Sequence, residues 1–544
     1  MDTMQAKVIS SMEKVMPFSE PMLVEDYGMM LKNETLHFQL AYKGHHGPRS
    51  TGRCHIEVRG ELAPFITIRK EQGVPVSFIP ADRDDYYLRE DTAVIPDVLT
   101  EFDEAGLVFP YKQWSAVWVS VRGDLQAGVY PTQFDLYDEG GTLYATLSYT
   151  VEVLDALAPK NKLRLTNWMH YDCICEWHKV KMFSPAFYRI FGEYLKAYVD
   201  TGFTMLLTPI FTPPLDTAVG AERMTAQLVS VYKTGEEYSF DFSKLKKFIR
   251  FALSHGVEYF EFSHLFTQWG GKACPKIMAY VDGEEKRIFG WDVPSDSEEY
   301  SRFLDEFFKA LVAFIKDMGI KDRCYFHLTD EPNGSHFESY KNCRDAVKKY
   351  IGDMPIMDAM HDYRYKEYGY VDIPVASTGF YERFAEHNVE DLFVYNCCEP
   401  TDGYYSNRFI NLPSQRTRIL GMQLYQTGVK GYLHWGYNFY KSSLSRVSVD
   451  PYSNTDCSGT LPAGDGYIVY PKADGVNRSI RSENVKDGFQ DYNALVLLES
   501  LISKQRVMEL LEEWGLRGYT QYPRSVKAHT EFKNKIYTLI KENL

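Results

Sequence analysis

The chain has 544 residues, of which 44% are hydrophobic and 25% charged, which is ordinary globular composition. Its length predicts about two to four domains, or one large barrel with appendages. The net charge of −14 gives no electrostatic support for a nucleic-acid partner, and the 15% aromatic content favours a neutral hydroxylated ligand over a phosphate.

The N-terminus and the cysteines indicate the compartment. Residues 1–21 contain neither an apolar signal segment nor a small-residue cleavage site, so a secretory signal is not expected. No run of about 18 apolar residues occurs, so we expect no membrane span. The nine cysteines are odd in number and scattered, which argues against a disulfide framework and predicts a cytoplasmic protein.

Residues 35–155 predict a β-domain. Segments such as LHFQLAYKG, CHIEVRG and TQFDLYD alternate polar and apolar residues, and turn signals such as DEGG at 138–141 separate them. This spacing is typical of an antiparallel β-sandwich. We place the N-terminal β-sandwich domain at residues 1–158, because the polar run at 156–162 with its proline interrupts the last strand.

After this joint, strand-like runs alternate with amphipathic helices. The eight candidate strands are 163–172, 203–211, 257–266, 323–331, 354–361, 371–377, 391–399 and 431–439. The candidate helices include 187–202, 242–256, 298–319, 336–352 and 416–428, several of which end in Gly. Eight such units predict an α/β fold with a (β/α)8 TIM barrel over residues 159–484. The alternative is a doubly wound sheet, but no phosphate-binding glycine fingerprint follows the first strand.

Three further segments surround the barrel. Long insertions at 212–241 and 268–297 follow the second and third strands, and we expect them to contact either the aglycone of a ligand or another subunit. Trp269, Tyr280 and Trp291 in the second insertion fit both interpretations. Residues 485–544 predict a C-terminal tail of amphipathic helices that packs on the barrel.

The chemistry of a barrel enzyme lies at the C-terminal ends of its strands. The fourth strand ends in HLTDEP, which brings Asp330 and Glu331 together. Neighbouring carboxyl groups separate in pKa, because one ionised group disfavours ionisation of the other and leaves it available as an acid. The alternative is that the pair only caps the helix that follows.

Polar and aromatic residues also gather at the other strand ends. This group includes Asn167, His170, His264, Asp358, His361, Tyr395, Trp435 and Tyr437. A barrel core needs apolar side chains, so a core role does not explain this collection. Rings for the apolar face of a sugar, with amide, imidazole and carboxylate groups for its hydroxyls, predict a carbohydrate-binding site, with an oligosaccharide or glycoside as the partner.

Several long runs carry a family resemblance. NWMHYDCI, LLTPIFTPPLDTAV, EFSHLFTQWG, FHLTDEP, YLHWGYNFY, GDGYIVYP and IRSENVKDGFQDYNAL resemble glycoside hydrolase family 123 and its wider set of relatives. The likeness covers about residues 160–495, with the β-sandwich in front of it. It implies a retaining exo-β-N-acetylgalactosaminidase that works by substrate-assisted catalysis.

The resemblance also assigns roles. It implies that Glu331 protonates the leaving oxygen and later activates water, while Asp330 holds the 2-acetamido N–H so that the substrate's own carbonyl attacks C1. Trp435 becomes the expected floor for the sugar ring, and Tyr395 or Tyr437 the donor to the acetamide oxygen. Asp465, within a Gly-Asp-Gly run, is expected to bind sugar hydroxyls.

Other interpretations stay open. Glu399, at the end of the seventh strand, is placed to act as a covalent nucleophile opposite Glu331. A non-catalytic carbohydrate-binding relative is a further alternative. We expect no cofactor and no metal, because the spacing of His170, Cys173, Cys175 and His178 is irregular for zinc. The sequence leaves open exo against endo action and whether the chain forms a homo-oligomer.

Overall fold

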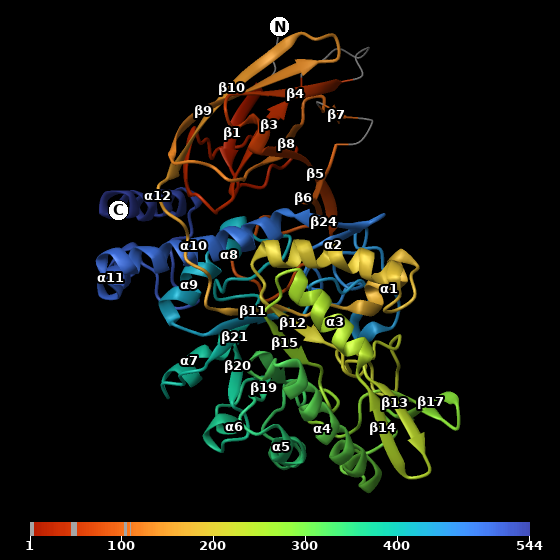
Figure 1. Cartoon of the computed structure of the whole chain (residues 1–544). Coiled ribbons are helices and arrows are strands. Elements are labelled where there is room, and N and C mark those ends of the chain that lie inside the picture. The colour runs from red at the N-terminus through yellow and green to blue at the C-terminus, as the bar shows by residue number, and fades with distance from the viewer. Residues whose placement is uncertain (1–4, 45–51, 103–105, 109) are drawn as a thin grey trace.

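The N-terminal region forms two stacked sheets, shown in red and orange at the top of Figure 1. The computed structural model describes residues 5–44, 52–102, 106–108 and 110–544. The seven-stranded sheet has the order β1-β3-β8-β5-β6-β24-β23, and the five-stranded sheet has the order β2-β10-β9-β4-β7. Their N-terminal strands are β1 (Gln5–Ser10), β2 (Tyr27–Leu31), β3 (Leu36–Lys43), β4 (Arg53–Arg59), β5 (Ile66–Val76), β6 (Ala93–Thr100), β7 (Leu107–Val108), β8 (Trp114–Val121), β9 (Gly128–Asp138) and β10 (Leu143–Leu154).

Side chains from both sheets share one core, as the predicted alternation requires. Phe38 and Val117 of the larger sheet are buried against Phe134 and Val151 of the smaller one. Apolar residues at every second position give each sheet one face to bury, and this burial holds the sheets together. The prediction of an antiparallel sandwich needs one correction, because β2 runs parallel to its neighbour β10.

The middle of the chain forms an eight-stranded parallel sheet in the order β18-β15-β12-β11-β22-β21-β20-β19. A parallel bridge between Phe326 and Ile356 links the two ends, so the sheet is a nearly closed barrel. The strands are β11 (Arg164–Asn167), β12 (Met205–Thr208), β15 (Tyr259–Phe262), β18 (Cys324–Phe326), β19 (Met357–Met360), β20 (Ile373–Ser377), β21 (Phe393–Tyr395) and β22 (Gly431–His434). All eight lie within the predicted strand-like runs, although each is shorter than its run.

Helices separate successive barrel strands, and most of the predicted ones are present. They are α1 (Tyr171–His178), α2 (Pro185–Thr201), α3 (Ser243–Ser254), α4 (Glu298–Met318), α5 (Phe337–Ile351), α6 (Arg364–Glu367), α7 (Tyr381–Ala385), α8 (Ser414–Arg418) and α9 (Leu420–Thr427). The helices α2, α4 and α9 end at Gly202, Gly319 and Gly428, each in the left-handed conformation that glycine adopts without steric cost.

The two insertions build a small sheet of their own beside the barrel. Its order is β14-β13-β16-β17, and its strands are β13 (Ser230–Thr234), β14 (Glu237–Asp241), β16 (Ile277–Val281) and β17 (Glu284–Phe289). The insertions meet where β13 pairs in parallel with β16, at Tyr232 and Tyr280. The yellow-green hairpins of this sheet project from the lower part of the molecule in Figure 1.

The chain returns to the N-terminal sheet after the last barrel strand. The hairpin β23 (Tyr470–Lys472) and β24 (Gly475–Ser479) joins the larger sheet through an antiparallel pairing of β24 with β6. The helix α10 (Ile480–Ile502) starts immediately afterwards and runs between sandwich and barrel (Figure 1). The predicted start of the tail at residue 485 therefore falls inside a helix, and the three domain boundaries stay predictions.

The tail helices α10, α11 (Lys504–Trp514) and α12 (Val526–Asn543) pack at the junction of the two parts. Their apolar faces share a core with Leu31 and Leu154 of the sandwich and with Met422 of α9. The tail thus contacts the sandwich as well as the barrel. Among the described residues, we find no helix with the length and apolar character needed to cross a membrane.

Candidate active site

A cavity of about 210 Å³ opens at the C-terminal ends of the barrel strands. Chain segments that follow β11, β12, β15, β18, β21 and β22 contribute to its wall. The lining residues are Trp168, Leu215, Asp216, Gln268, Trp269, Asp330, Glu331, Ala359, Tyr395, Cys397, Cys398, Leu433, Trp435 and Leu461. Four of the predicted site residues, Asp330, Glu331, Tyr395 and Trp435, therefore meet in one cavity.

The carboxyl pair lies on irregular backbone beyond β18. The strand ends at Phe326, five residues before Glu331, and Glu331 has a φ of 44°, which is unusual for a residue with a side chain. Such strained backbone persists only where surrounding structure holds it, and the amide of Trp269 does so here by donating to the carbonyl of Asp330 (2.9 Å). The helix α5 begins later, at Phe337 with His336 as its N-cap, so the pair does not cap it.

The two carboxyl groups differ in their surroundings. Burial, together with the negative charges of Glu331 and Asp358, raises the pKa of Asp330 well above its ordinary value. The side chain of Glu331 is 35% exposed and opens into the cavity. Neighbouring carboxyl groups in such a site do not both ionise easily, so the pair retains a proton at a higher pH than two isolated acids would.

Tyr395 and His361 form a hydrogen-bonded chain to Glu331. The Tyr395 hydroxyl donates to Oε1 of Glu331 at 2.5 Å, and Nε2 of His361 lies 2.6 Å from the same hydroxyl. His361 stacks on Phe380, and burial lowers its pKa. A neutral ring that donates from Nε2 satisfies this geometry, because the tyrosine proton is already directed at Glu331.

Trp435 lines the cavity, and residues outside the cavity lining fix its orientation. Its Nε1 donates to Oδ2 of Asp465 at 3.0 Å, and Nε2 of His170 donates to the backbone carbonyl of Trp435 at 3.0 Å. Asp465 is fully buried, and this burial raises its pKa to about 7. Its carboxyl group thus orients the indole and does not line the cavity, while contact between Asp465 and sugar hydroxyls stays a prediction.

Besides His361 and Asp465, five more predicted binding residues lie outside the cavity lining. These are Asn167, His170, His264, Asp358 and Tyr437, all nine-tenths or more buried. Tyr437 donates to the carbonyl of Tyr194 (3.2 Å) within the barrel wall, and Arg223 holds the ring of His170. Their strand-end positions are as predicted, but their side chains belong to layers beneath or behind the cavity, so direct contact with a ligand there is not supported.

A buried charged layer lies among those residues. His327 is flanked by two carboxyl groups, with Nε2 2.9 Å from Glu261 and Nδ1 3.2 Å from Asp358. Both ring nitrogens face acceptors, so the ring carries two protons, and these hydrogen bonds outweigh burial and raise its pKa to about 9. Glu261 also accepts from Nε1 of Trp168, which lines the cavity (3.0 Å). This imidazolium thus supports the cavity floor.

Sequence reasoning did not single out Glu261, His327, Asp216 or Gln268. A glutamate inside the apolar run YFEF was a signal for Glu261, because a charged residue on a buried strand needs a partner. Asp216 lines the cavity with one carboxylate oxygen unpartnered, and burial raises its pKa. It lies in an irregular insertion, where no periodic pattern marks it.

Two clusters contain the side chains that commonly bind metal ions. His264, His327 and Asp358 lie close together, but the rings of His264 and His327 are stacked at 4.4 Å with planes 16° apart. Stacked rings direct their nitrogen lone pairs side by side rather than toward one point, so this set does not fit a metal. The second cluster is the run from His170 to His178, whose spacing is irregular for zinc. Here His178 forms a hydrogen bond with Tyr194 (3.1 Å), whereas His170 forms one with Arg223.

The remaining candidates occupy different places. Glu399 is exposed and does not line the cavity, although its charge acts on His361. Trp269 lines the cavity, whereas Trp291 lines a neighbouring one and Tyr280 stacks on Tyr232 in the small sheet. The geometry therefore offers the Asp330 and Glu331 carboxyl groups, a tyrosine donor and an indole face to a single ligand.

Comparison with known proteins identifies similar sequences and structures. The sequence model described as "Glycoside hydrolase 123, catalytic domain" matches residues 168–498. No curated protein matches the sequence. A family 123 glycoside hydrolase from Clostridium perfringens, studied for glycolipid glycan hydrolysis, superposes with a TM-score of 0.74 and 14% identity over 99% of both chains. A Bacteroides ovatus GH5 xyloglucanase gives a TM-score of only 0.29, at 8% identity over 85% of this chain and 98% of its own.

Proposed function

The chain belongs to glycoside hydrolase family 123, and from this membership we propose that it is a retaining exo-β-N-acetylgalactosaminidase that uses the 2-acetamido group of its substrate as the nucleophile. The observation that carries the proposal is the adjacent pair Asp330 and Glu331 in a cavity lined by Trp435 and Tyr395. The C. perfringens relative was studied for glycolipid glycan hydrolysis, which makes such glycans a reasonable substrate class here.

Glu331 is the acid and base of this reaction. Its proton passes to the glycosidic oxygen as the bond from that oxygen to C1 breaks, and the acetamide carbonyl oxygen forms a new bond to C1 on the opposite face. The resulting oxazolinium ring opens when water attacks C1, and Glu331 takes the proton of that water. Two inversions at C1 give net retention.

Asp330 aligns the acetamide group. Its carboxylate accepts the acetamide N–H, which directs the carbonyl oxygen toward C1 and stabilises the positive charge of the oxazolinium ring. In the free protein the raised pKa of Asp330 favours its protonated form. An acetamide N–H that donates to Asp330 favours the ionised form instead, so substrate binding redistributes the proton of the pair. The proton shared by the pair then resides on Glu331, where the leaving group needs it.

Aromatic side chains complete the site. The indole of Trp435 offers a flat apolar face for the sugar ring, and its bond to Asp465 fixes the orientation of that face. The Tyr395 hydroxyl fixes Glu331 at one oxygen, which leaves the other for the glycosidic bond. Hydrogen bonds thus fix both the Glu331 carboxyl group and the Trp435 indole before a ligand binds. This reduces the entropy that these side chains lose on binding.

Substrate choice tests the proposal. The protein should hydrolyse aryl β-N-acetylgalactosaminides but not the matching galactosides, and a thiazoline mimic of the intermediate should inhibit it competitively. A 2-fluoro sugar should leave no covalent label. Labelling of Glu399, or equal rates with and without the acetamide, would establish the covalent mechanism instead. Binding of sugars without turnover of a broad glycoside panel would indicate a non-catalytic relative.

A further inference from the structure

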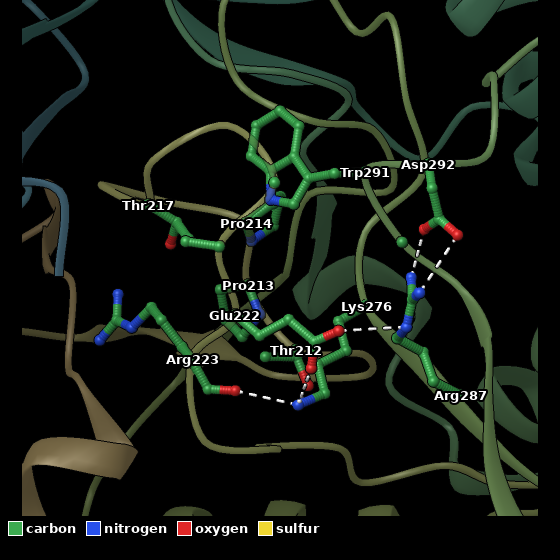
Figure 2. Close-up of a pocket in the computed structure, with 13 residues that line it drawn as sticks. Thr212, Pro213, Pro214, Thr217, Glu222, Arg223, Lys276, Arg287, Trp291 and Asp292 are labelled. Atoms are coloured by element: carbon green, nitrogen blue, oxygen red, sulfur yellow. Dashed lines mark hydrogen bonds and ion pairs between the residues drawn. The ribbon is translucent and has the colours of Figure 1, made fainter. Parts of the chain in front are cut away.

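A second cavity, of about 200 Å³, lies between the two insertions (Figure 2). One wall is the segment 212–223 that follows β12, and the other is the segment 276–292 that contains β16 and β17. The lining residues are Thr212, Pro213, Pro214, Thr217, Glu222, Arg223, Lys276, Arg287, Trp291 and Asp292, with three small residues, Gly220, Ala221 and Gly290.

This cavity adjoins the catalytic one. Leu215 and Asp216 line the catalytic cavity, and the residues on either side of them, Pro214 and Thr217, line the second. Gln268 of the catalytic cavity donates its side-chain N–H to the carbonyl of Thr217 (2.8 Å). A single stretch of chain therefore separates the two cavities, and a ligand that extends over it reaches both.

The dividing segment is rigidly anchored. Arg223 is buried and binds both carboxylate oxygens of Asp172 on α1, at 2.9 and 2.7 Å. It also donates to the carbonyl of Leu215 (3.1 Å), and its own carbonyl accepts from Lys276 (3.1 Å). The guanidinium group thus ties the wall of the second cavity to the barrel, so the shape of this cavity does not depend on a loose loop.

The chemistry of the lining is that of a sugar site. In Figure 2, Pro213 and Pro214 lie between the indole of Trp291 and a row of charged side chains. In that row Lys276 pairs with Glu222 (2.8 Å), Glu222 with Arg287 (3.1 Å), and Arg287 with Asp292. The row joins two cations to two anions. It offers hydrogen bonds in fixed positions without net charge, and the indole and the two prolines add apolar surface to the same cavity.

We propose that this second cavity binds a neutral sugar unit of the substrate on the leaving-group side of the cleaved bond, a proposal that rests on the proposed glycosidase function. A hexopyranose presents an apolar face to Trp291 and hydroxyls to Glu222 and Arg287. An anionic ligand is disfavoured, because it would have to displace a carboxylate from Arg287 or Lys276. Substrates of two or more sugars then gain contacts that aryl glycosides do not make.

Kinetics with substrates of graded length test the assignment. Trp291→Ala should lower kcat/KM about tenfold for oligosaccharides of two to four sugars that end in β-N-acetylgalactosamine, since truncation of an aromatic side chain that a ligand covers has costs of this order. The rate on an aryl β-N-acetylgalactosaminide should stay unchanged. Tyr280→Ala is the matched control, because Tyr280 lies on the same small sheet but outside the cavity.

Binding measurements separate this proposal from the proposed function. Calorimetric titration of the Glu331→Gln protein with the same oligosaccharides should show affinity that increases with length, and Trp291→Ala should remove that increase. Equal behaviour of the Trp291→Ala and Tyr280→Ala proteins with every length would overturn the subsite. If the wild type hydrolyses no glycoside, the proposed function fails, and the proposal that depends on it fails with it; hydrolysis without length dependence removes the subsite alone.

Discussion

The phenolic hydroxyl of Tyr395 donates to the carboxylate of Glu331 across 2.5 Å. On its other side, the same oxygen lies 2.6 Å from Nε2 of His361. Tyr395 is therefore the link through which a partly exposed histidine holds the proposed catalytic acid, and the pKa of the tyrosine is raised well above its ordinary value by burial and by Glu331. The Tyr395 hydroxyl therefore stays protonated at neutral and mildly alkaline pH and acts as a hydrogen-bond donor.

Removal of that hydroxyl should mainly affect turnover. We expect Tyr395→Phe to lower kcat about ten- to a hundredfold with a smaller change in KM, because a misplaced acid affects the transition state more than substrate binding. Steady-state kinetics on an aryl β-N-acetylgalactosaminide measures both. Tyr437→Phe is the control, since the hydroxyl of Tyr437 donates to the Tyr194 carbonyl in the barrel wall. Equal losses in the two variants would refute a positioning role for Tyr395.

Glu331 and Glu399 should differ sharply in importance. Glu331→Gln should reduce kcat/KM about 10²- to 10⁴-fold, which is the range that general acid–base catalysis supplies. Glu399→Gln should retain nearly full activity, because Glu399 is exposed and outside the cavity lining. Kinetic measurements on both variants, with circular dichroism to confirm folding, decide the matter. A comparable loss in Glu399→Gln would favour the covalent alternative.

His327 should act as a buried cation up to mildly alkaline pH. Its pKa in the folded protein is about 9, above the unfolded value of 6.5, so its contribution to stability is complete below pH 6.5 and disappears as the pH rises through about 9. Nitrogen-15 NMR of labelled histidines should show one imidazolium that titrates near that pH. His327→Gln should remove the signal and destabilise the fold by about 3 kcal/mol, because Glu261 and Asp358 lose their cation.

His264, which stacks on His327, provides a control for this titration. His264 has no hydrogen-bond partner for either nitrogen, and burial lowers its pKa well below 6.5. His264→Gln should therefore leave the alkaline titration in place. A His327 that is neutral at pH 7 in the spectrum would contradict the proposed charged layer.

Asp465 should make the protein less stable as the pH rises. Its folded pKa of about 7 exceeds the ordinary value of 3.8. The unfolded chain therefore releases this proton near pH 4 while the folded protein holds it until about pH 7, so the free energy of unfolding falls over that range. Full conversion of this shift gives roughly 4 kcal/mol as an upper bound. Asp465→Asn keeps an acceptor for Trp435 and avoids the loss, so its melting temperature relative to wild type should increase from pH 5 to pH 8. A pH-independent difference would show that the pKa of Asp465 is the same in the folded and unfolded protein, which would contradict the raised value.

The barrel could be predicted because each short parallel strand is a buried apolar run followed by an amphipathic helix. The ends of the strands could not be located. The run at 323–331 continues its mixture of apolar and polar residues beyond Phe326, where the chain has already left the sheet to form the site. The small insertion sheet was also missed, because β13 and β16 pair across about forty residues of sequence that carry no signal for each other.

The predicted site separates into two layers for a physical reason. Asp330, Glu331, Tyr395 and Trp435 line the cavity, while Asp358, His264 and Asn167 lie buried beneath or behind it. All of them lie near strand ends, but Asn167 and Asp358 are within their strands, whereas Asp330, Glu331 and Trp435 follow the last residue of theirs. Sequence pattern indicates the right end of the barrel but does not resolve depth within it.

The hairpin of β23 and β24 has a consequence for anyone who wishes to shorten this protein. It leaves the barrel, adds two strands to the N-terminal sheet, and is followed directly by α10, whose Arg481 forms a buried ion pair with Asp97 of β6 at 2.9 Å. Deleting the first 158 residues would expose the edge of β24 and leave that guanidinium group without its carboxylate. We therefore expect a fragment that begins at residue 159 to be less stable than the whole chain, and fusion junctions are better placed outside the range from β1 to α12.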